Sequence, residues 1–188
     1  AILYAEKAGF QSVGENRVQE ALDKMRNERC PHSIQWELIG HLQSNKTKEA
    51  AQHFSRIQSV DSEKLLRRLD SHALDPGRPI RILIQVNAGE DPAKYGVRCD
   101  DAEKLLETAM DCEQLAVEGL MTIAPLSDDP GLARRCFSRL RETRDRLSKS
   151  TGLSLDELSM GMTDDLEAAI AEGSTQIRIG RALYGDRE

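Results

Sequence analysis

The regular alternation of short apolar runs with amphipathic segments constrains the fold of this chain more than any other feature of its sequence. Seven runs have the length and composition of buried strands, and segments of helical periodicity separate them. Such alternation predicts a parallel sheet covered by helices. The strands are expected at 10–13, 34–42, 56–60, 80–86, 115–123, 157–158 and 175–183. The helices are expected at 1–9, 18–29, 45–54, 63–73, 100–112, 132–148 and between Thr163 and Gly173, with a turn at 75–79.

The number of strands favours a barrel over an open sheet. A (β/α)8 barrel, or TIM barrel, needs eight strands and typically ~250 residues, whereas this sequence has 188 residues and begins inside a helix, with no capping residue before Ala1. We therefore expect an α/β protein with a single barrel domain over 1–188 that lacks its first strand and is truncated at its N-terminus. An open doubly wound sheet is the alternative, although no glycine-rich turn follows the first expected strand.

Composition and charge exclude several classes of function. The formal net charge is −6, which gives no basis for a nucleic-acid partner, and no apolar run approaches the ~20 residues of a membrane span. The cysteines are far apart in the sequence, and neither they nor the histidines show the spacing of metal ligands. We expect reduced thiols, a cytoplasmic location, no membrane partner and no bound metal.

Two strand ends near the C-terminus carry the strongest functional signal. Small and polar residues at 159–163 follow one expected strand, and Thr163 can cap the helix that comes next. In the last expected strand, alternation places Gln176 and Arg178 on one face, and Gly180 lets the backbone approach a ligand. An arginine inside a buried strand needs an anion or another acceptor as its partner. The two strand ends therefore predict a phosphate site.

Polar residues also follow the other expected strands, which suggests one lined pocket at their C-terminal ends. Each of these residues has a structural explanation as well. Asn16 suits a turn equally well, and His41 suits a structural histidine equally well. Asp61 and Ser62 are better explained as caps of the helix that follows them. Arg178 is the hardest to explain without a ligand, with an ion pair inside the barrel as the alternative.

Several distinctive blocks follow one another along the chain. They are VGENRVQE at 13–20, WELIGHLQSNK at 36–46, IQSVDS at 57–62, GLMTI at 119–123, and LSMGMTDD with TQIRIGRALYG between 158 and 185. Taken together and in order, these blocks resemble the pyridoxal phosphate homeostasis proteins. The departures within these blocks are mild, such as Glu37 where the family has a histidine.

The resemblance implies a barrel like the N-terminal domain of alanine racemase, with pyridoxal 5′-phosphate (PLP) at its C-terminal mouth. Arg178 matches the arginine that faces the pyridine nitrogen, where it weakens PLP as an electron sink. Asn16 and His41 match positions that line the pocket. The phosphate contacts implied by the resemblance are Ser159, Gly161, Met162 and Thr163, with mainly backbone contacts from Ile179, Gly180 and Arg181.

The family's Schiff-base lysine lies in a first-strand block that this chain does not contain. The resemblance therefore predicts that the lysine lies upstream of Ala1 and is absent here, which leaves a gap in the barrel. It implies a non-enzymatic protein of intracellular PLP homeostasis that holds PLP and supplies it to apo-enzymes, with no catalytic residue. We expect this protein to be a monomer. A PLP-dependent racemase-like enzyme is the alternative, but it needs a lysine and an opposing acid or base. A third hypothesis is a barrel fragment that keeps no ligand.

Overall fold

A six-stranded parallel sheet forms the centre of the structure, a computed structural model that describes residues 2–73, 78–127 and 129–185. Each strand pairs with the next one along the chain. Strand order thus follows sequence order and never reverses, which excludes the doubly wound alternative and fits a barrel. The strands are β1 (Ser12–Glu15), β2 (Gln35–Leu38), β3 (Arg56–Val60), β4 (Ile80–Gln85), β5 (Leu115–Met121) and β6 (Glu157–Ser159).

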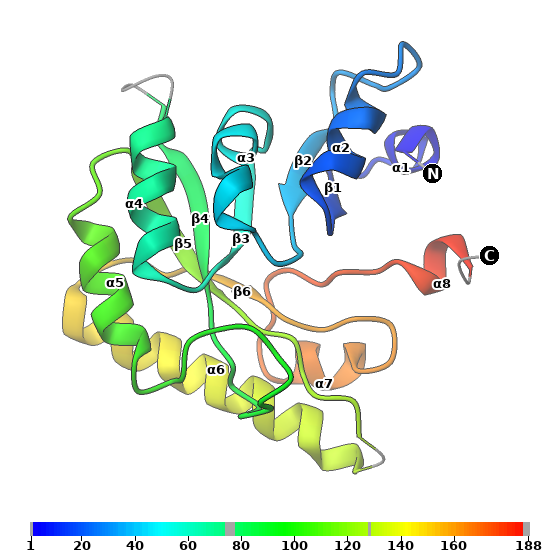
Figure 1. The fold of residues 1–188 in the computed structure, drawn as a ribbon. Coiled ribbons are helices and arrows are strands. Elements are labelled where there is room, and N and C mark those ends of the chain that lie inside the picture. The colour runs from blue at the N-terminus through cyan, green and yellow to red at the C-terminus, as the bar shows by residue number, and fades with distance from the viewer. Residues whose placement is uncertain (1, 74–77, 128, 186–188) are drawn as a thin grey trace.

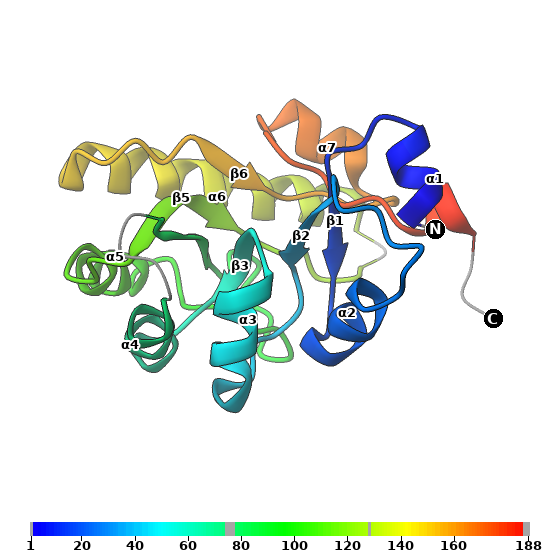
Figure 2. The same cartoon turned by 90° about the horizontal axis from the view of Figure 1, so that it is seen from above.

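Helices lie around the outside of the curved sheet, as the two directions of Figures 1 and 2 show. None of the described helices is long and apolar enough to cross a bilayer. The helical segments are α1 (Ile2–Lys7), α2 (Val18–Met25), the 3-10 turn η1 (Ser44–Lys46), α3 (Thr47–His53), α4 (Glu63–His72), α5 (Ala102–Met110), α6 (Pro130–Thr151), α7 (Leu166–Ala171) and α8 (Arg181–Tyr184).

Most helices match the sequence-based expectation in position, although their ends differ. Helix α6 begins earlier than residue 132 because the Asp129 side chain accepts a hydrogen bond from the Gly131 N–H at 2.9 Å and so caps it. Thr163 was expected to cap α7, but the helix begins at Leu166 with Asp165 as its N-cap residue. The turn expected at 75–79 lies mostly outside the described residues.

The prediction of one regular strand over residues 175–183 is wrong. Only the first part of this segment pairs with β6, through a parallel bridge between Ser159 and Gln176. The Met160 N–H donates to the Gln176 carbonyl at 3.1 Å, and the Arg178 N–H donates to the Gly161 carbonyl at 3.0 Å. Within the described residues, the segment pairs only with β6 and the turn that follows it. It therefore forms too few backbone hydrogen bonds to be a regular strand. It then turns into α8.

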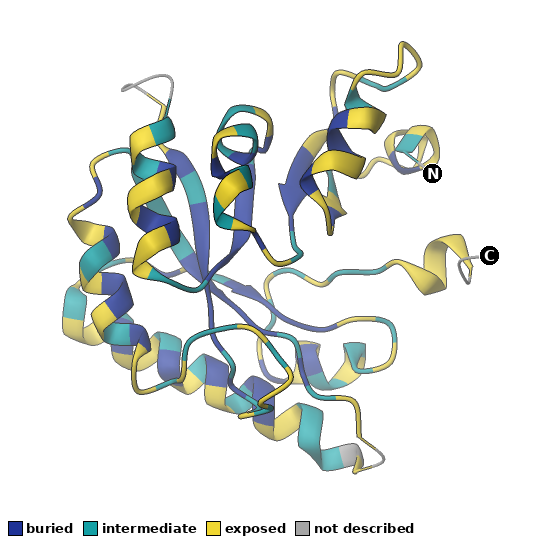
Figure 3. Ribbon diagram, viewed as in Figure 1, coloured by how far each residue is buried: buried dark blue, intermediate teal, exposed yellow. Residues whose placement is uncertain are grey.

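The apolar core lies between the outer face of the sheet and the helices. Figure 3 shows the buried residues gathered on the strands and on the sides of the helices that face them. Alternation along β2 and β3 turns Leu38 and Ile57 into this core, whereas Glu37, Arg56 and Gln58 point to the inner face. Barrels of this kind usually fill their interior with branched apolar side chains. The inner face here is instead largely polar, although Leu83 and Met121 also lie on it, and it leads to the candidate site.

A close approach between β5 and β6 gives the first testable prediction. A Cβ added at Gly119 would lie 2.0 Å from the carbonyl oxygen of Glu157. Gly119→Ala should therefore push the two strands apart and lower the free energy of unfolding by about 1–3 kcal/mol, measured by urea denaturation. Gly180→Ala is the control, because no described heavy atom lies within 4 Å of the added Cβ and its φ of −119° is one that alanine adopts without strain. Equal losses in the two variants would contradict the close approach.

Candidate functional site

A buried ion cluster occupies the inner face of the sheet near the beginnings of the strands. Arg56, at the start of β3, donates two hydrogen bonds of 3.1 Å to the two carboxylate oxygens of Glu37. It also donates to Glu118 at 3.1 Å and lies 3.6 Å from Glu157. Arg56 and Glu37 are only 6% and 5% exposed. Three carboxylates, from β2, β5 and β6, thus compensate one desolvated guanidinium.

The charge of Glu37 is maintained by its neighbours. Burial by itself would raise the pKa of this carboxyl, but hydrogen bonds from Gln176 and Gln58 and the charge of Arg56 hold the pKa below its ordinary value. Glu37 is therefore ionised in the folded protein at neutral pH.

A ladder of amide side chains connects this cluster to the other end of the sheet. The Gln58 amide donates to Glu37 at 2.5 Å and to the side-chain oxygen of Gln176 at 3.0 Å. The Ser159 hydroxyl donates to the side-chain oxygen of Gln58 at 2.6 Å. Because every link is a hydrogen bond between buried or half-buried groups, the ladder fixes the position of Ser159 at the end of β6.

Arg178 lies at the top of this ladder. Its guanidinium donates to the Ser159 hydroxyl at 2.6 Å and to the Thr122 carbonyl at 2.8 Å. Burial lowers the pKa of Arg178 to about 10, and the charge of Asp165 opposes this shift. No carboxylate in the described part of the chain forms an ion pair with it, so the structural ion pair considered in the sequence analysis is not found. The partners of Arg178 are neutral acceptors. The sequence predicted either an anion or another acceptor for an arginine at this position.

The turn after β6 lies against the segment that follows Arg178. Gly161 has φ 97°, and a Cβ there would lie 2.4 Å from the Cβ of Ala169, so only glycine fits. The Asp164 carboxylate contacts the Arg181 guanidinium. These contacts bring together the two segments that the sequence predicted to form a phosphate site.

Several backbone donors in these two segments have no protein acceptor in the described residues. They are the N–H groups of Gly161, Thr163, Ile179 and Gly180. Met162 differs, because its N–H donates to the Asp165 carboxylate at 2.6 Å. Successive unpaired N–H groups in a turn are a common binding site for anions. Four of the predicted phosphate-site residues therefore keep a donor available, and Met162 does not.

Asn16 and His41 follow β1 and β2 at the same end of the sheet. A Cβ at Gly40, next to His41, would lie 2.2 Å from the Asn16 carbonyl oxygen, so the two strand ends touch. The Ser59 hydroxyl donates to the Gly40 carbonyl at 2.6 Å, which ties this corner to β3. Both residues thus lie at the C-terminal edge of the strands, where the sequence predicted them.

Asp61 does not act as the helix cap that the sequence favoured. The N-cap residue of α4 is Ser62, and no side-chain hydrogen bond is made there. Asp61 instead faces His41, with 4.0 Å between its Oδ2 atom and the Nδ1 atom of the imidazole. Burial raises the pKa of Asp61, and the charge of His41 opposes the shift.

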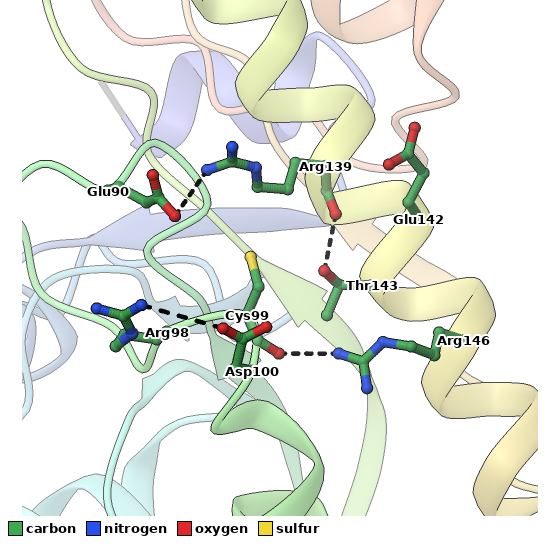
Figure 4. Close-up of a pocket in the computed structure, with 8 residues that line it drawn as sticks. All are labelled: Glu90, Arg98, Cys99, Asp100, Arg139, Glu142, Thr143 and Arg146. Carbon is green, nitrogen blue, oxygen red and sulfur yellow. Dashed lines mark hydrogen bonds and ion pairs between the residues drawn. The ribbon is translucent and has the colours of Figure 1, made fainter.

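A hollow of about 420 Å³ lies elsewhere, between the loop after β4 and helix α6 (Figure 4). Its charges largely cancel, since Arg139 pairs with Glu90 at 3.1 Å and Arg98 faces Asp100 at 4.0 Å. A third arginine, Arg146, donates to the Cys99 carbonyl at 2.9 Å. The hollow therefore favours neither an anion nor a cation. Within the described residues no group of three histidine, cysteine, aspartate or glutamate side chains could hold a metal ion.

Known proteins resemble this chain over its full length. The family model for the alanine racemase N-terminal domain matches residues 1–188. The pyridoxal phosphate homeostasis protein of Pseudomonas aeruginosa is 40% identical over 188 residues, which cover 100% of this chain and 80% of that protein. The protein of the same name from Escherichia coli is 36% identical over 193 residues, covering 100% and 81%.

Solved structures share the fold. PipY of Synechococcus elongatus, with PLP bound, has a TM-score of 0.89 and 39% identity, and the match covers 98% of this chain and 86% of that one. An alanine racemase of Clostridium difficile has a TM-score of 0.83 at 13% identity, covering 99% and 48%. The second likeness shows the fold alone.

The depressed pKa of Glu37 predicts how stability depends on pH. Because the folded-state pKa lies below the unfolded value, the ion cluster contributes its full stability above the ordinary carboxyl pKa of about 4.3, and that contribution is lost as pH falls through the folded pKa. Glu37→Gln should flatten the acid side of the stability curve, measured as urea midpoints between about pH 7 and about pH 3.

Glu20→Gln is the matched control for this experiment, because Glu20 pairs with Arg17 at the protein surface. It should leave the acid slope unchanged. A slope that is the same in the wild type and Glu37→Gln would contradict the assignment of the buried charge.

Proposed function

The chain belongs to the pyridoxal phosphate homeostasis proteins, within the alanine racemase N-terminal domain family, and we propose that it binds PLP at the ends of β6 and the 176–181 segment. Arg178 carries the proposal, because its half-buried guanidinium has neutral protein partners. A partly desolvated cation without a carboxylate partner is stabilised by an anionic or acceptor ligand.

The residues present fit the phosphate group of PLP. The unpaired N–H groups of Gly161, Thr163, Ile179 and Gly180 supply donors for its oxygens. Gly161 is required in this turn, because its φ is 97° and a side chain there would collide with Ala169 of α7. Ser159 holds Arg178, and Asn16 and His41 line the remaining edge of the proposed pocket. Met162 and Arg181 adjoin the same turn.

Arg178 also suits the pyridine nitrogen of PLP. PLP in enzymes serves as an electron sink, which is most effective when that nitrogen is protonated. A guanidinium donates hydrogen bonds and cannot accept a proton, so facing the nitrogen it keeps this atom unprotonated. The proposed site therefore binds and orients PLP without promoting catalysis. The names of the curated relatives, which are homeostasis proteins, support the same function.

We propose accordingly that residues 1–188 form one PLP-binding domain of a monomeric, cytoplasmic protein that holds PLP and supplies it to apo-enzymes. The four cysteines are free thiols, which supports a reducing compartment. We propose that the residues named above hold PLP non-covalently, so that borohydride treatment of this chain yields no stoichiometric adduct.

The experiment that tests the site compares Arg178→Met with the wild type in an equilibrium titration with PLP, followed by absorbance. Loss of a charged hydrogen-bond donor costs about 1.5–3 kcal/mol, so the variant should bind about 10- to 100-fold more weakly. Pyridoxal, which lacks the phosphate, should bind more weakly than PLP to the wild type, because the backbone donors then have no anion to bind.

Arg144→Met is the matched control, since Arg144 is also half-buried and donates to the Leu155 carbonyl at 3.2 Å, but lies in α6. It should bind PLP as the wild type does. Equal affinity in Arg178→Met and the wild type would contradict the proposed site, as would conversion of alanine or serine enantiomers by the PLP-loaded protein.

A further inference from the structure

A stacked pair of rings lies at the mouth of the sheet, outside the segments assigned to PLP phosphate. The His41 imidazole and the Tyr95 ring have centroids 3.8 Å apart and planes inclined by only 11°. Tyr95 comes from the loop between β4 and α5, and it is 57% exposed. An exposed aromatic ring in a loop is usually free to rotate, so a parallel stack indicates that the backbone holds Tyr95 in place.

The backbone around Tyr95 is held by the end of β4. Val97 forms a parallel bridge with Val86, and its N–H donates to the Gln85 carbonyl at 2.9 Å. The Gln85 side chain donates to the Tyr95 carbonyl at 3.2 Å. Gly96 has φ 116°, and a Cβ there would lie 2.7 Å from the Asn87 nitrogen. The loop therefore returns along its own strand and presents Tyr95 at a fixed position.

Asp61 restricts the orientation of the His41 imidazole from a second side. Its carboxylate lies 4.0 Å from the Nδ1 atom of His41 and faces the backbone N–H of Gly96. The side chain of Asp61 is 14% exposed and that of His41 is 34% exposed. The ring of Tyr95 restricts the plane of the imidazole, and the carboxylate restricts its rotation, so His41 is held in one orientation.

We propose that Tyr95 is a positioning residue for ligand binding, which acts by fixing the imidazole of His41 at the mouth of the sheet. This inference rests on the proposed function for its effect on PLP. It requires of residue 95 only an aromatic ring, because no hydrogen bond of the Tyr95 hydroxyl is found within the described residues. Phenylalanine should therefore replace Tyr95, and alanine should not.

The first test is a spectroscopic signature in the ligand-free protein. A ring stacked at 3.8 Å shields the carbon-bound protons of the imidazole. In NMR spectra, the His41 ring signals of the wild type and Tyr95→Phe should lie upfield of those in Tyr95→Ala. Tyr95 is exposed, so its removal opens no core cavity and should leave the fold intact. Identical His41 signals in Tyr95→Ala and the wild type would overturn the stack.

The second test is a double-mutant cycle on PLP affinity. Tyr95→Ala should bind PLP about 2- to 10-fold more weakly than the wild type, and Tyr95→Phe should bind equally well. In a His41→Ala background, Tyr95→Ala should have no further effect. A full effect in that background would overturn the positioning role, because Tyr95 would then act on its own.

The two tests separate this inference from the proposed function. Failure of the wild type to bind PLP would overturn the proposed function and the effect of Tyr95 on affinity, whatever the NMR result. Binding that is retained in Tyr95→Ala, with a normal loss in Arg178→Met, would overturn only the role of Tyr95.

Discussion

The structure depends on how two arginine side chains are compensated inside a parallel sheet. A guanidinium removed from water is costly unless anions or acceptors surround it. Arg56 meets this requirement with Glu37, Glu118 and Glu157 near the beginnings of the strands. Arg178 meets it only partly, with a hydroxyl and a carbonyl at the other end. The interior of the sheet is therefore neutralised at one end and positive at the other.

This asymmetry links the fold to binding. Hydrogen bonds run without interruption from Glu37 through Gln58 to Ser159, which accepts a hydrogen bond from Arg178. The ion cluster therefore helps to fix the position of Arg178. Rigid support of this kind keeps a binding group in place before the ligand arrives, which reduces the ordering cost of binding. An anion bound beside Arg178 would in turn stabilise the folded protein by mass action.

Much of this arrangement was predictable from the sequence, because strand alternation and strand ends are local signals. They placed Arg178 and Gln176 on the inner face, and 159–163 at a turn. The ion cluster was not predictable, since Gln176 reaches Glu37 across 139 residues and only the strand order brings them together. The regular strand expected up to residue 183 was wrong, because local alternation does not reveal whether a neighbour supplies a second ladder. The contact of Tyr95 with His41 was missed, because a loop carries no periodicity that reports where its side chains lie.

We propose that PLP lies at the ends of β6 and the 176–181 segment with its ring nitrogen facing Arg178. A crystal structure of this chain with PLP is the most direct test of this placement. We expect phosphate oxygens within hydrogen-bond distance of the Gly161, Thr163 and Gly180 N–H groups, and the Arg178 guanidinium opposite the pyridine nitrogen. PLP bound in the hollow beside α6, or attached to a surface lysine with Arg178 still bonded only to Ser159 and Thr122, would contradict it.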